Sequence, residues 1–178
     1  LESVNDSAED FVKPDLSNMV RGSKPQVIYS LTPQDEQKRF INELKSCVES
    51  GDVPLDQMMV LCSDKMSSWG LKRTIAAALG YKSVVNCNDR NDLDNNLGSR
   101  IRVMSINSCT GMESGVTFVL GVGDLLNAAN NIELSEDERE VIKQESTRKL
   151  YVAMTRAGQK LVLLSTERLP DRVAGYVD

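Results

Sequence analysis

The chain has 178 residues, of which 40% are hydrophobic and 26% are charged, and its formal net charge is −5. A chain of this length can bury a core of its own, and no apolar run approaches the roughly 20 residues that a membrane span needs. The polar, acidic N-terminus does not resemble a secretory signal, so we expect a cytoplasmic protein with no membrane partner. The first residue is Leu1 rather than Met, and we therefore expect a chain that was processed or cut from a longer one.

The residue types argue against several chemistries. The chain has no histidine, which is the commonest general base and metal ligand. Its cysteines lie far apart and form no C-x-x-C pair, so we expect reduced thiols and no zinc or other metal site. They are Cys47, Cys62, Cys87 and Cys109. The acidic charge and the few aromatic residues argue against strong binding of nucleic acid by this domain alone.

The first half of the chain is predicted to alternate strands and helices. Residues 1–25 are polar and are interpreted as a lead-in segment. A strand is predicted over 26–31, followed by a helix that begins at Thr32 and Pro33 and ends at Gly51. The remaining predictions here are a buried strand over 58–62, a helix over 69–79, a short strand over 82–86 and an Asn- and Asp-rich surface loop over 86–99.

The second half continues the alternation. Strands are predicted over 101–106 and 116–122, with a loop of small residues between them, and a last strand is predicted over 160–165. A capping-box pattern at Ser135 predicts a helix that runs to about Ala157, with Gly158 as its cap. The chain then ends in a tail over 167–178.

This alternation predicts one α/β domain over 26–166, with a mostly parallel sheet covered by helices on both faces. Ligands of such sheets bind beyond the carboxyl ends of the strands. We expect two segments at that edge, the loop after Ile106 and the helix end before Lys160.

Two segments resemble motifs of the UvrD/Rep-type superfamily 1 helicases. Residues 101–113, IRVMSINSCTGME, resemble motif V, and residues 148–157, RKLYVAMTRA, resemble motif VI more closely. The resemblance covers about residues 26–165 and implies a RecA-like, P-loop NTPase-like three-layer domain. In these helicases two such motor domains hold ATP between them, and this chain is similar to the second. It contains no G-x-x-x-x-G-K-[ST] phosphate loop.

The resemblance also implies roles for individual residues. Arg156 would be the catalytic arginine finger that contacts the γ-phosphate of ATP, and Gly111 and Glu113 would complete this side of the nucleotide site. The residues that would face the phosphates of single-stranded DNA are Ser105, Asn107 and Ser108. The Mg²⁺ ligands and the water-activating acid would come from the N-terminal RecA-like domain of the same polypeptide, so this chain alone should not hydrolyse ATP.

Departures from the motifs leave alternatives open. Asn107 and Thr110 stand where motif V usually has His and Lys, so two groups that can carry positive charge are absent. A degenerate, non-catalytic RecA-like module that binds nucleic acid or protein is one alternative, and a flavodoxin-like α/β regulator is another. Arg156 could simply cap its helix, since cations are favoured at helix C-termini. Arg148 and Lys149 are interpreted as a solvated pair on the same helix.

Overall fold

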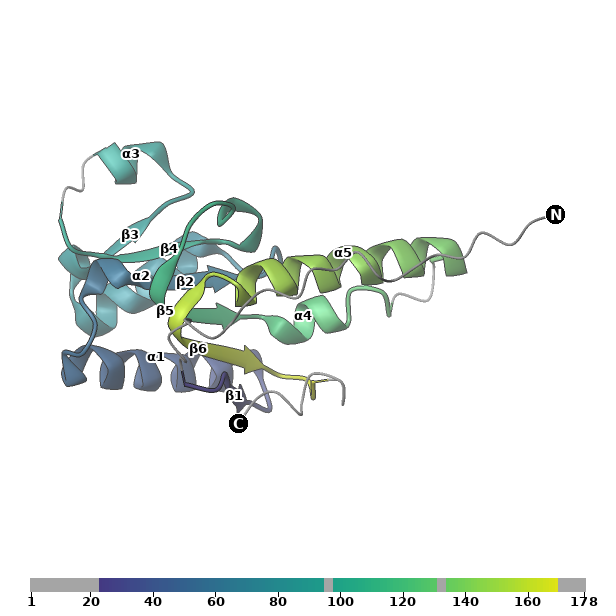
Figure 1. The fold of residues 1–178 in the computed structure, drawn as a ribbon, viewed down its shortest axis with the longest axis horizontal. Helices are drawn as coiled ribbons and strands as arrows, with labels where there is room; N and C mark the ends of the chain where they lie inside the picture. Colours follow the sequence, from purple (N-terminus) through teal and green to yellow (C-terminus); the bar gives the residue numbers. More distant parts are fainter. Residues whose placement is uncertain (1–22, 95–97, 131–133, 170–178) are drawn as a thin grey trace, which may run out of the picture.

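The computed structural model describes residues 23–94, 98–130 and 134–169. Its centre is a sheet of six strands in the order β1-β6-β5-β2-β4-β3, in which every neighbouring pair is parallel (Figure 1). The strands are β1 (Gln26–Tyr29), β2 (Met58–Cys62), β3 (Val84–Asn86), β4 (Ile101–Ser105), β5 (Ser114–Leu120) and β6 (Ala157–Ser165). The predicted α/β class with a parallel sheet is confirmed. A flavodoxin-like sheet has the order 2-1-3-4-5, so that alternative is wrong.

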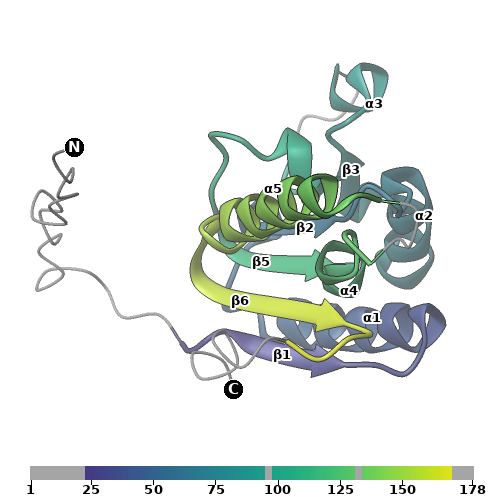
Figure 2. The ribbon, with the colours of Figure 1, turned by 90° about the vertical axis from the view of Figure 1, so that its right-hand side faces the viewer.

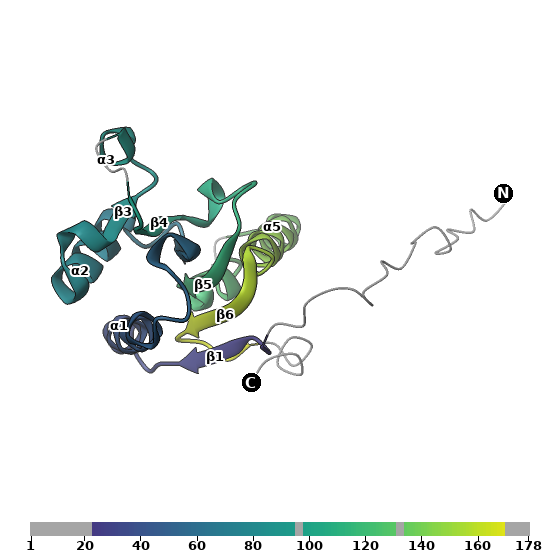
Figure 3. The ribbon, with the colours of Figure 1, turned by 60° about the vertical axis from the view of Figure 1, so that its left-hand side comes forward.

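Helices cover both faces of the sheet and complete the three predicted layers. One face packs against α1 (Pro33–Ser50) and α2 (Ser68–Leu79), and the other packs against α4 (Val122–Leu126) and α5 (Glu136–Met154). Figures 2 and 3 show α1 and α5 on opposite sides of the strands. Each face therefore has its own apolar core cluster, with the sheet between them.

Strand β2 shows why the central strands have no polar face. Met58, Val60 and Cys62 belong to the cluster beneath α1 and α2, whereas Met59 and Leu61 belong to the cluster beneath α5. All five side chains are fully buried. Successive side chains of a strand point to opposite faces, so a strand covered on both sides is apolar throughout. This continuous run is what made the prediction over 58–62 match the observed bounds.

Helix α1 begins and ends where the sequence predicts. Thr32 Oγ1 accepts a hydrogen bond from the backbone N–H of Asp35 at 3.1 Å, and Pro33 is the first helical residue. Gly51 ends the helix with φ +71°, in the left-handed region that favours glycine.

Several predicted element bounds differ from the observed ones, and three of the differences are instructive. The predicted loop over 86–99 contains a short helix, α3 (Arg90–Asp94). Gly158 does not cap α5 but lies inside β6, because pairing with β5 begins at Ala157. The strand predicted over 116–122 starts earlier, at Ser114, and ends at Leu120, so Val122 already belongs to α4. In the second and third cases sheet pairing outweighs the local signal.

The prediction that the helix end before Lys160 lies at the carboxyl edge of the sheet is also wrong. Helix α5 runs antiparallel to the strands, so its last turn lies at the amino end of β6, while its first half extends past the strands (Figure 1). A helix that returns the chain to a parallel strand must end at the edge where that strand begins.

Two further predictions concern the ends of the chain and membranes. The lead-in over 1–25 and the tail over 167–178 lie mostly outside the described residues, and the domain bounds of 26–166 stay a prediction. Within the described ranges, none of the helices combines the length and the apolar character that crossing a bilayer requires.

Candidate functional site

The connection from β4 to β5 contains no α-helix, and we call its residues 106–113 the crossover loop. It starts with the 3₁₀ turn η3 (Ile106–Ser108) at the carboxyl end of β4 and reaches β5 at its amino end. Ile106 and Cys109 are buried in the core cluster that α5 covers. The crossover loop therefore runs from one edge of the sheet to the other and is held against α5 on the way.

Arg156 follows the end of α5, and its guanidinium group is tied down by three hydrogen bonds. Nε donates to the carbonyl oxygen of Val152 at 3.1 Å, and Nη2 donates to Thr155 Oγ1 at 3.1 Å. Nη1 donates to the carbonyl oxygen of Met112 at 3.2 Å. The bond to Val152 caps the last turn of α5, so the capping alternative describes a real contact. The bond to Met112 fixes the arginine to the crossover loop.

Gly111 and Glu113 flank the residue that Arg156 contacts. Gly111 is exposed, has φ +76°, and has no neighbouring atom within 4 Å of the place a Cβ would take, so a ligand can approach its backbone. The Glu113 carbonyl accepts from Arg102 Nη2 at 2.8 Å, but its exposed carboxylate makes no ion pair or hydrogen bond within the described part of the chain. Ser114 N donates to the Arg156 carbonyl at 3.0 Å. The structure thus brings Gly111, Glu113 and Arg156 together at the amino ends of β5 and β6.

Ser105 and Ser108 lie at the opposite edge, where they share one partner. Their hydroxyl oxygens are 3.0 Å apart, and Asn88 Nδ2 donates to both, at 3.3 Å and 3.1 Å respectively. Asn88 Oδ1 accepts from the backbone N–H of Ser105 at 3.0 Å. The amide of Asn88, which follows β3, therefore holds the two hydroxyls in place at the carboxyl end of β4.

Asn107 is held by a different residue, Asp64, which follows β2. Asn107 Nδ2 donates to Asp64 Oδ1 at 2.9 Å, and Lys149 Nζ of α5 pairs with Asp64 Oδ2 at 3.0 Å and with Glu145 at 3.1 Å. The hydrogen bonds that Lys149 donates to Asp64 and Glu145 raise the pKa of Lys149 above its ordinary value, so it stays charged. Asp64 therefore links the crossover loop to α5.

A pocket of about 220 Å³ lies between the crossover loop and α5. Its lining combines residues of both motif-like segments and includes polar and apolar side chains. The lining residues are Ile106, Asn107, Thr110, Glu145, Arg148, Lys149 and Val152.

Cys109, beneath this pocket, is not an activated nucleophile. Burial raises the pKa of the Cys109 thiol, and the positive charge of Arg156 opposes that rise without overcoming it. The thiol also lies 3.0 Å from the Ile106 carbonyl oxygen, to which it donates. It is a buried packing group of the crossover loop.

The predicted site residues thus form two groups at opposite edges of the sheet. The nucleotide group is Gly111, Glu113 and Arg156, and the nucleic-acid group is Ser105, Asn107 and Ser108. The sequence reasoning missed Asp64 and Asn88, which hold the second group. The sequence could have indicated both, because each is a polar residue that closely follows a predicted strand. The carboxyl ends of parallel strands meet at one edge of the sheet, where ligands bind.

The described residues contain no group of three His, Cys, Asp or Glu side chains that could hold a metal ion. The two guanidinium N–H groups that Arg156 does not use, together with the Glu113 carboxylate, fit one side of a nucleotide site. The Mg²⁺ ligands that the resemblance places in another domain stay a prediction.

Comparison with known proteins finds a likeness in fold to solved structures. No family model matches the sequence, and no curated protein matches it. The fold is similar to a solved structure described as the C-terminal domain of a possible DNA helicase from Lactobacillus plantarum WCFS1, with a TM-score of 0.57. The two chains share 17% identity over 88% of this chain and 82% of the other. At that identity the likeness shows a shared fold.

Proposed function

We propose that this chain is the second motor domain of an ATP-dependent superfamily 1 DNA helicase. The observation that carries the proposal is the hydrogen bond from Arg156 Nη1 to the Met112 carbonyl. It joins the arginine of the motif VI-like segment to the motif V-like loop, between Gly111 and Glu113. The shared fold with a domain described as part of a possible DNA helicase supports the same assignment.

In the proposed site each residue has a distinct task. ATP bound between the two motor domains supplies the phosphoryl group for hydrolysis. Arg156 directs its two unused N–H groups at the γ-phosphate oxygens, where planar guanidinium donors match the geometry. The Glu113 carboxylate accepts a hydrogen bond from a ribose hydroxyl. The bonds to Val152 and Met112 hold Arg156 in place before the nucleotide arrives, which lowers the cost of reorganisation.

The degenerate-module alternative is favoured by one observation. Asn107 already donates one amide N–H to Asp64, and Thr110 carries no charge. The crossover loop itself therefore has no cation that could bind a DNA phosphate. This alternative expects no ATP turnover from the complete protein. The helicase proposal expects turnover that single-stranded DNA stimulates.

The test is Arg156→Ala in the complete protein, with both motor domains present. We expect the rate of DNA-stimulated ATP hydrolysis to fall by about 10³-fold or more, because an arginine finger contributes about 10³–10⁵ in rate. Steady-state turnover with saturating single-stranded DNA measures the effect. A loss smaller than tenfold would rule out the finger role.

Arg39→Ala is the matched control. Arg39 is a half-exposed arginine on α1 that pairs with Asp35 at 2.8 Å, on the opposite face of the sheet. Its removal should leave turnover unchanged. Thermal unfolding of the Arg156 variant separates a catalytic loss from a folding defect, because losing the cap on α5 also costs stability.

A further inference from the structure

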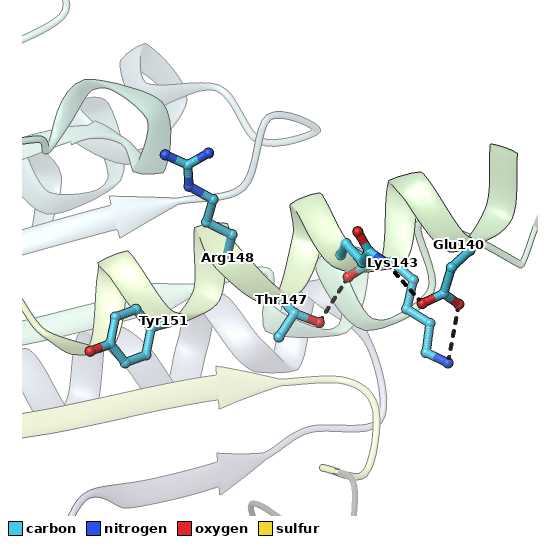
Figure 4. A pocket seen from close by; sticks show the side chains of 6 residues that line it. Glu140, Lys143, Thr147, Arg148 and Tyr151 are labelled. Carbon is cyan, nitrogen blue, oxygen red and sulfur yellow. Dashed lines mark hydrogen bonds and ion pairs between the residues drawn. The ribbon is translucent and has the colours of Figure 1, made fainter. Parts of the chain in front are cut away.

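Arg148 is the exposed cation of the pocket between the crossover loop and α5. It lies one helical turn before Val152. Figure 4 draws a second pocket, formed by α5 residues that include Lys143, which Arg148 also lines; there the Arg148 side chain extends away from α5, apart from Thr147 and Tyr151. It makes no ion pair or hydrogen bond to any residue that the structure describes. Thr110 lines the same pocket from the crossover loop, at the position where the motif V-like segment lacks a cation.

Arg148 has no direct ion-pair partner within the described residues, unlike its neighbour Lys149. Both nearby carboxylates, Asp64 and Glu145, contact Lys149 instead, at 3.0 Å and 3.1 Å. Asp64 also fixes the orientation of Asn107, whose amide keeps a second N–H beyond the one that Asp64 accepts. A guanidinium group with no carboxylate partner, next to a hydroxyl and an amide donor, is suited to an oxyanion.

We infer that this pocket binds one backbone phosphate of single-stranded nucleic acid, with Arg148 as the charged donor and Thr110 and Asn107 as neutral donors. This inference rests on the proposed function and adds a binding residue to it. Arg148 of α5 would thus supply the positive charge that Thr110 of the crossover loop does not carry. The volume of about 220 Å³ holds several water molecules, which a phosphate group can replace.

The position of the pocket favours a strand phosphate over a nucleotide phosphate. Ile106 and Asn107 place its rim at the carboxyl end of β4, beside the hydroxyls of Ser105 and Ser108 that Asn88 holds. The proposed nucleotide group lies at the other end of the crossover loop. A strand that passes Ser105 and Ser108 can therefore reach Arg148.

The test measures binding of labelled oligothymidine to the 178-residue chain by fluorescence anisotropy over a series of salt concentrations. We expect Arg148→Gln to weaken binding at low salt by about tenfold, the effect of one charge-assisted hydrogen bond. The slope of log affinity against log salt should become shallower by about 0.7, which is the contribution of one phosphate contact on a single strand.

Lys143→Gln is the matched control, because Lys143 is an exposed cation on the same helix that does not line this pocket. It should change the salt slope much less. A double variant, Thr110→Lys with Arg148→Gln, moves the cation across the pocket and should restore most of the affinity. Equal losses in the Arg148 and Lys143 variants would overturn the inference, and so would a double variant as weak as Arg148→Gln.

Three other outcomes separate this inference from the proposed function. If the wild-type chain does not bind oligothymidine at low salt, while the complete protein still shows DNA-stimulated ATP turnover, the inference fails and the proposed function stands. Absence of both activities overturns both. If Arg148→Gln instead impairs ATP binding and leaves oligothymidine binding intact, the pocket belongs to the nucleotide and the inference is wrong.

Discussion

Lys72 is the most deeply buried cation among the described residues. Its side chain is 1% exposed, its Nζ lies 2.7 Å from Asp92 Oδ1, and the rings of Trp69 and Tyr81 each have their centres 4.7 Å away. Burial alone would lower the pKa of Lys72, but hydrogen bonds to Asp92 and Tyr81 outweigh it and raise the pKa. Asp92 Oδ2 in turn accepts from the Asn86 N–H at 2.6 Å. Lys72 therefore anchors α3 to α2 and β3.

Replacing Lys72 with Met should destabilise the fold by about 3 kcal/mol, because removing one partner of a buried ion pair leaves an uncompensated charge. Urea unfolding measures the free energy. Adding Asp92→Asn to this variant should recover part of the loss, since the remaining charge is then gone. Lys38→Met, at an exposed position of α1, is the control and should change stability by less than about 0.5 kcal/mol. A loss of that small size at Lys72 would contradict the anchoring role.

For individual residues, the sequence predicts which polar side chains belong to a site better than it predicts their hydrogen-bond partners. Ser105, Asn107 and Ser108 were identified as polar groups after a strand, and the structure places them there. Their partners Asp64 and Asn88 are distant in sequence from the groups they bind, so local pattern could not pair them. Three-dimensional contact, not residue type, decides which donors are left for a ligand.

Among the elements, α5 differs from α1 in what holds it in the helical state. Only Leu150 and Ala153 of α5 are buried, both near its C-terminus. Its N-terminus depends on a capping box, in which the Ser135 hydroxyl accepts from the Glu138 N–H at 3.4 Å and the Glu138 carboxylate accepts from the Ser135 N–H at 2.8 Å. The Ser135 hydroxyl also donates to Glu138 Oε2 at 2.7 Å. This bond, together with the one from the Ser135 N–H, holds the pKa of Glu138 below its usual value, so the cap is lost as pH falls through that lowered pKa.

We therefore expect Ser135→Ala to loosen the first turns of α5 without unfolding the domain. A lost cap costs about 1 kcal/mol, or about a fivefold loss of amide protection. Hydrogen exchange should show this loss over the first turns of α5 only. Thr32→Ala on α1 is the contrasting variant, because the buried Phe40 and Leu44 tie that helix to the core. Thr32→Ala should therefore lower the global free energy of unfolding. If Ser135→Ala also reduced amide protection across the whole domain, the prediction of a local effect would be contradicted.

Short-range sequence features predict where helices and strands occur better than they predict where each one ends. The capping box at Ser135 and the Thr32–Pro33 start are short-range features, and both predictions are confirmed. Gly158 carried an equally clear local signal, yet it lies in β6 because pairing with β5 already begins at Ala157. The end of an element depends on its partner in the fold, which the local sequence does not contain.

For the whole molecule, Glu36 connects the two covering layers around the carboxyl edge of the sheet. It lies on α1, is 3% exposed, and its Oε1 accepts from the Gly121 N–H at 2.9 Å, just before α4. Burial raises the pKa of Glu36 to about 7; the bond from Gly121 opposes this rise and the charge of Asp124 adds to it. Asp124 itself accepts from Ser63 Oγ at 2.6 Å.

The stability of the domain should therefore depend on the protonation of Glu36. The folded state holds a proton that the unfolded state releases near pH 4.5, so this contribution is complete below pH 4.5 and is lost as pH rises through about 7. Glu36→Gln, which mimics the protonated form, should be more stable than wild type at pH 8 by up to about 3 kcal/mol. The two should be equally stable near pH 4.5.

Thermal unfolding of both proteins across this pH range measures the difference. Glu49→Gln, at an exposed position near the end of α1, is the control and should show no such pH dependence relative to wild type. A constant difference between Glu36→Gln and wild type at all pH values would contradict the raised pKa.

The sequence predicted the layers and the parallel sheet because hydrophobic periodicity reports burial directly. It placed the end of α5 at the wrong edge, because pattern alone does not give the direction in which a helix crosses the sheet. The two groups of site residues consequently lie farther apart in the fold than the prediction of a single edge implied.

The crossover loop gives the two edges a short covalent path, since no helix separates β4 from β5. Its first residue, Ile106, and Cys109 near its middle are both buried, so we expect a displacement at one end of the loop to be transmitted toward the other end. Thermodynamic reciprocity then applies to any two ligands that bind at its ends: each changes the affinity of the other by the same factor. We therefore expect an insertion into this loop to weaken any such coupling between the two edges without changing a residue of either site.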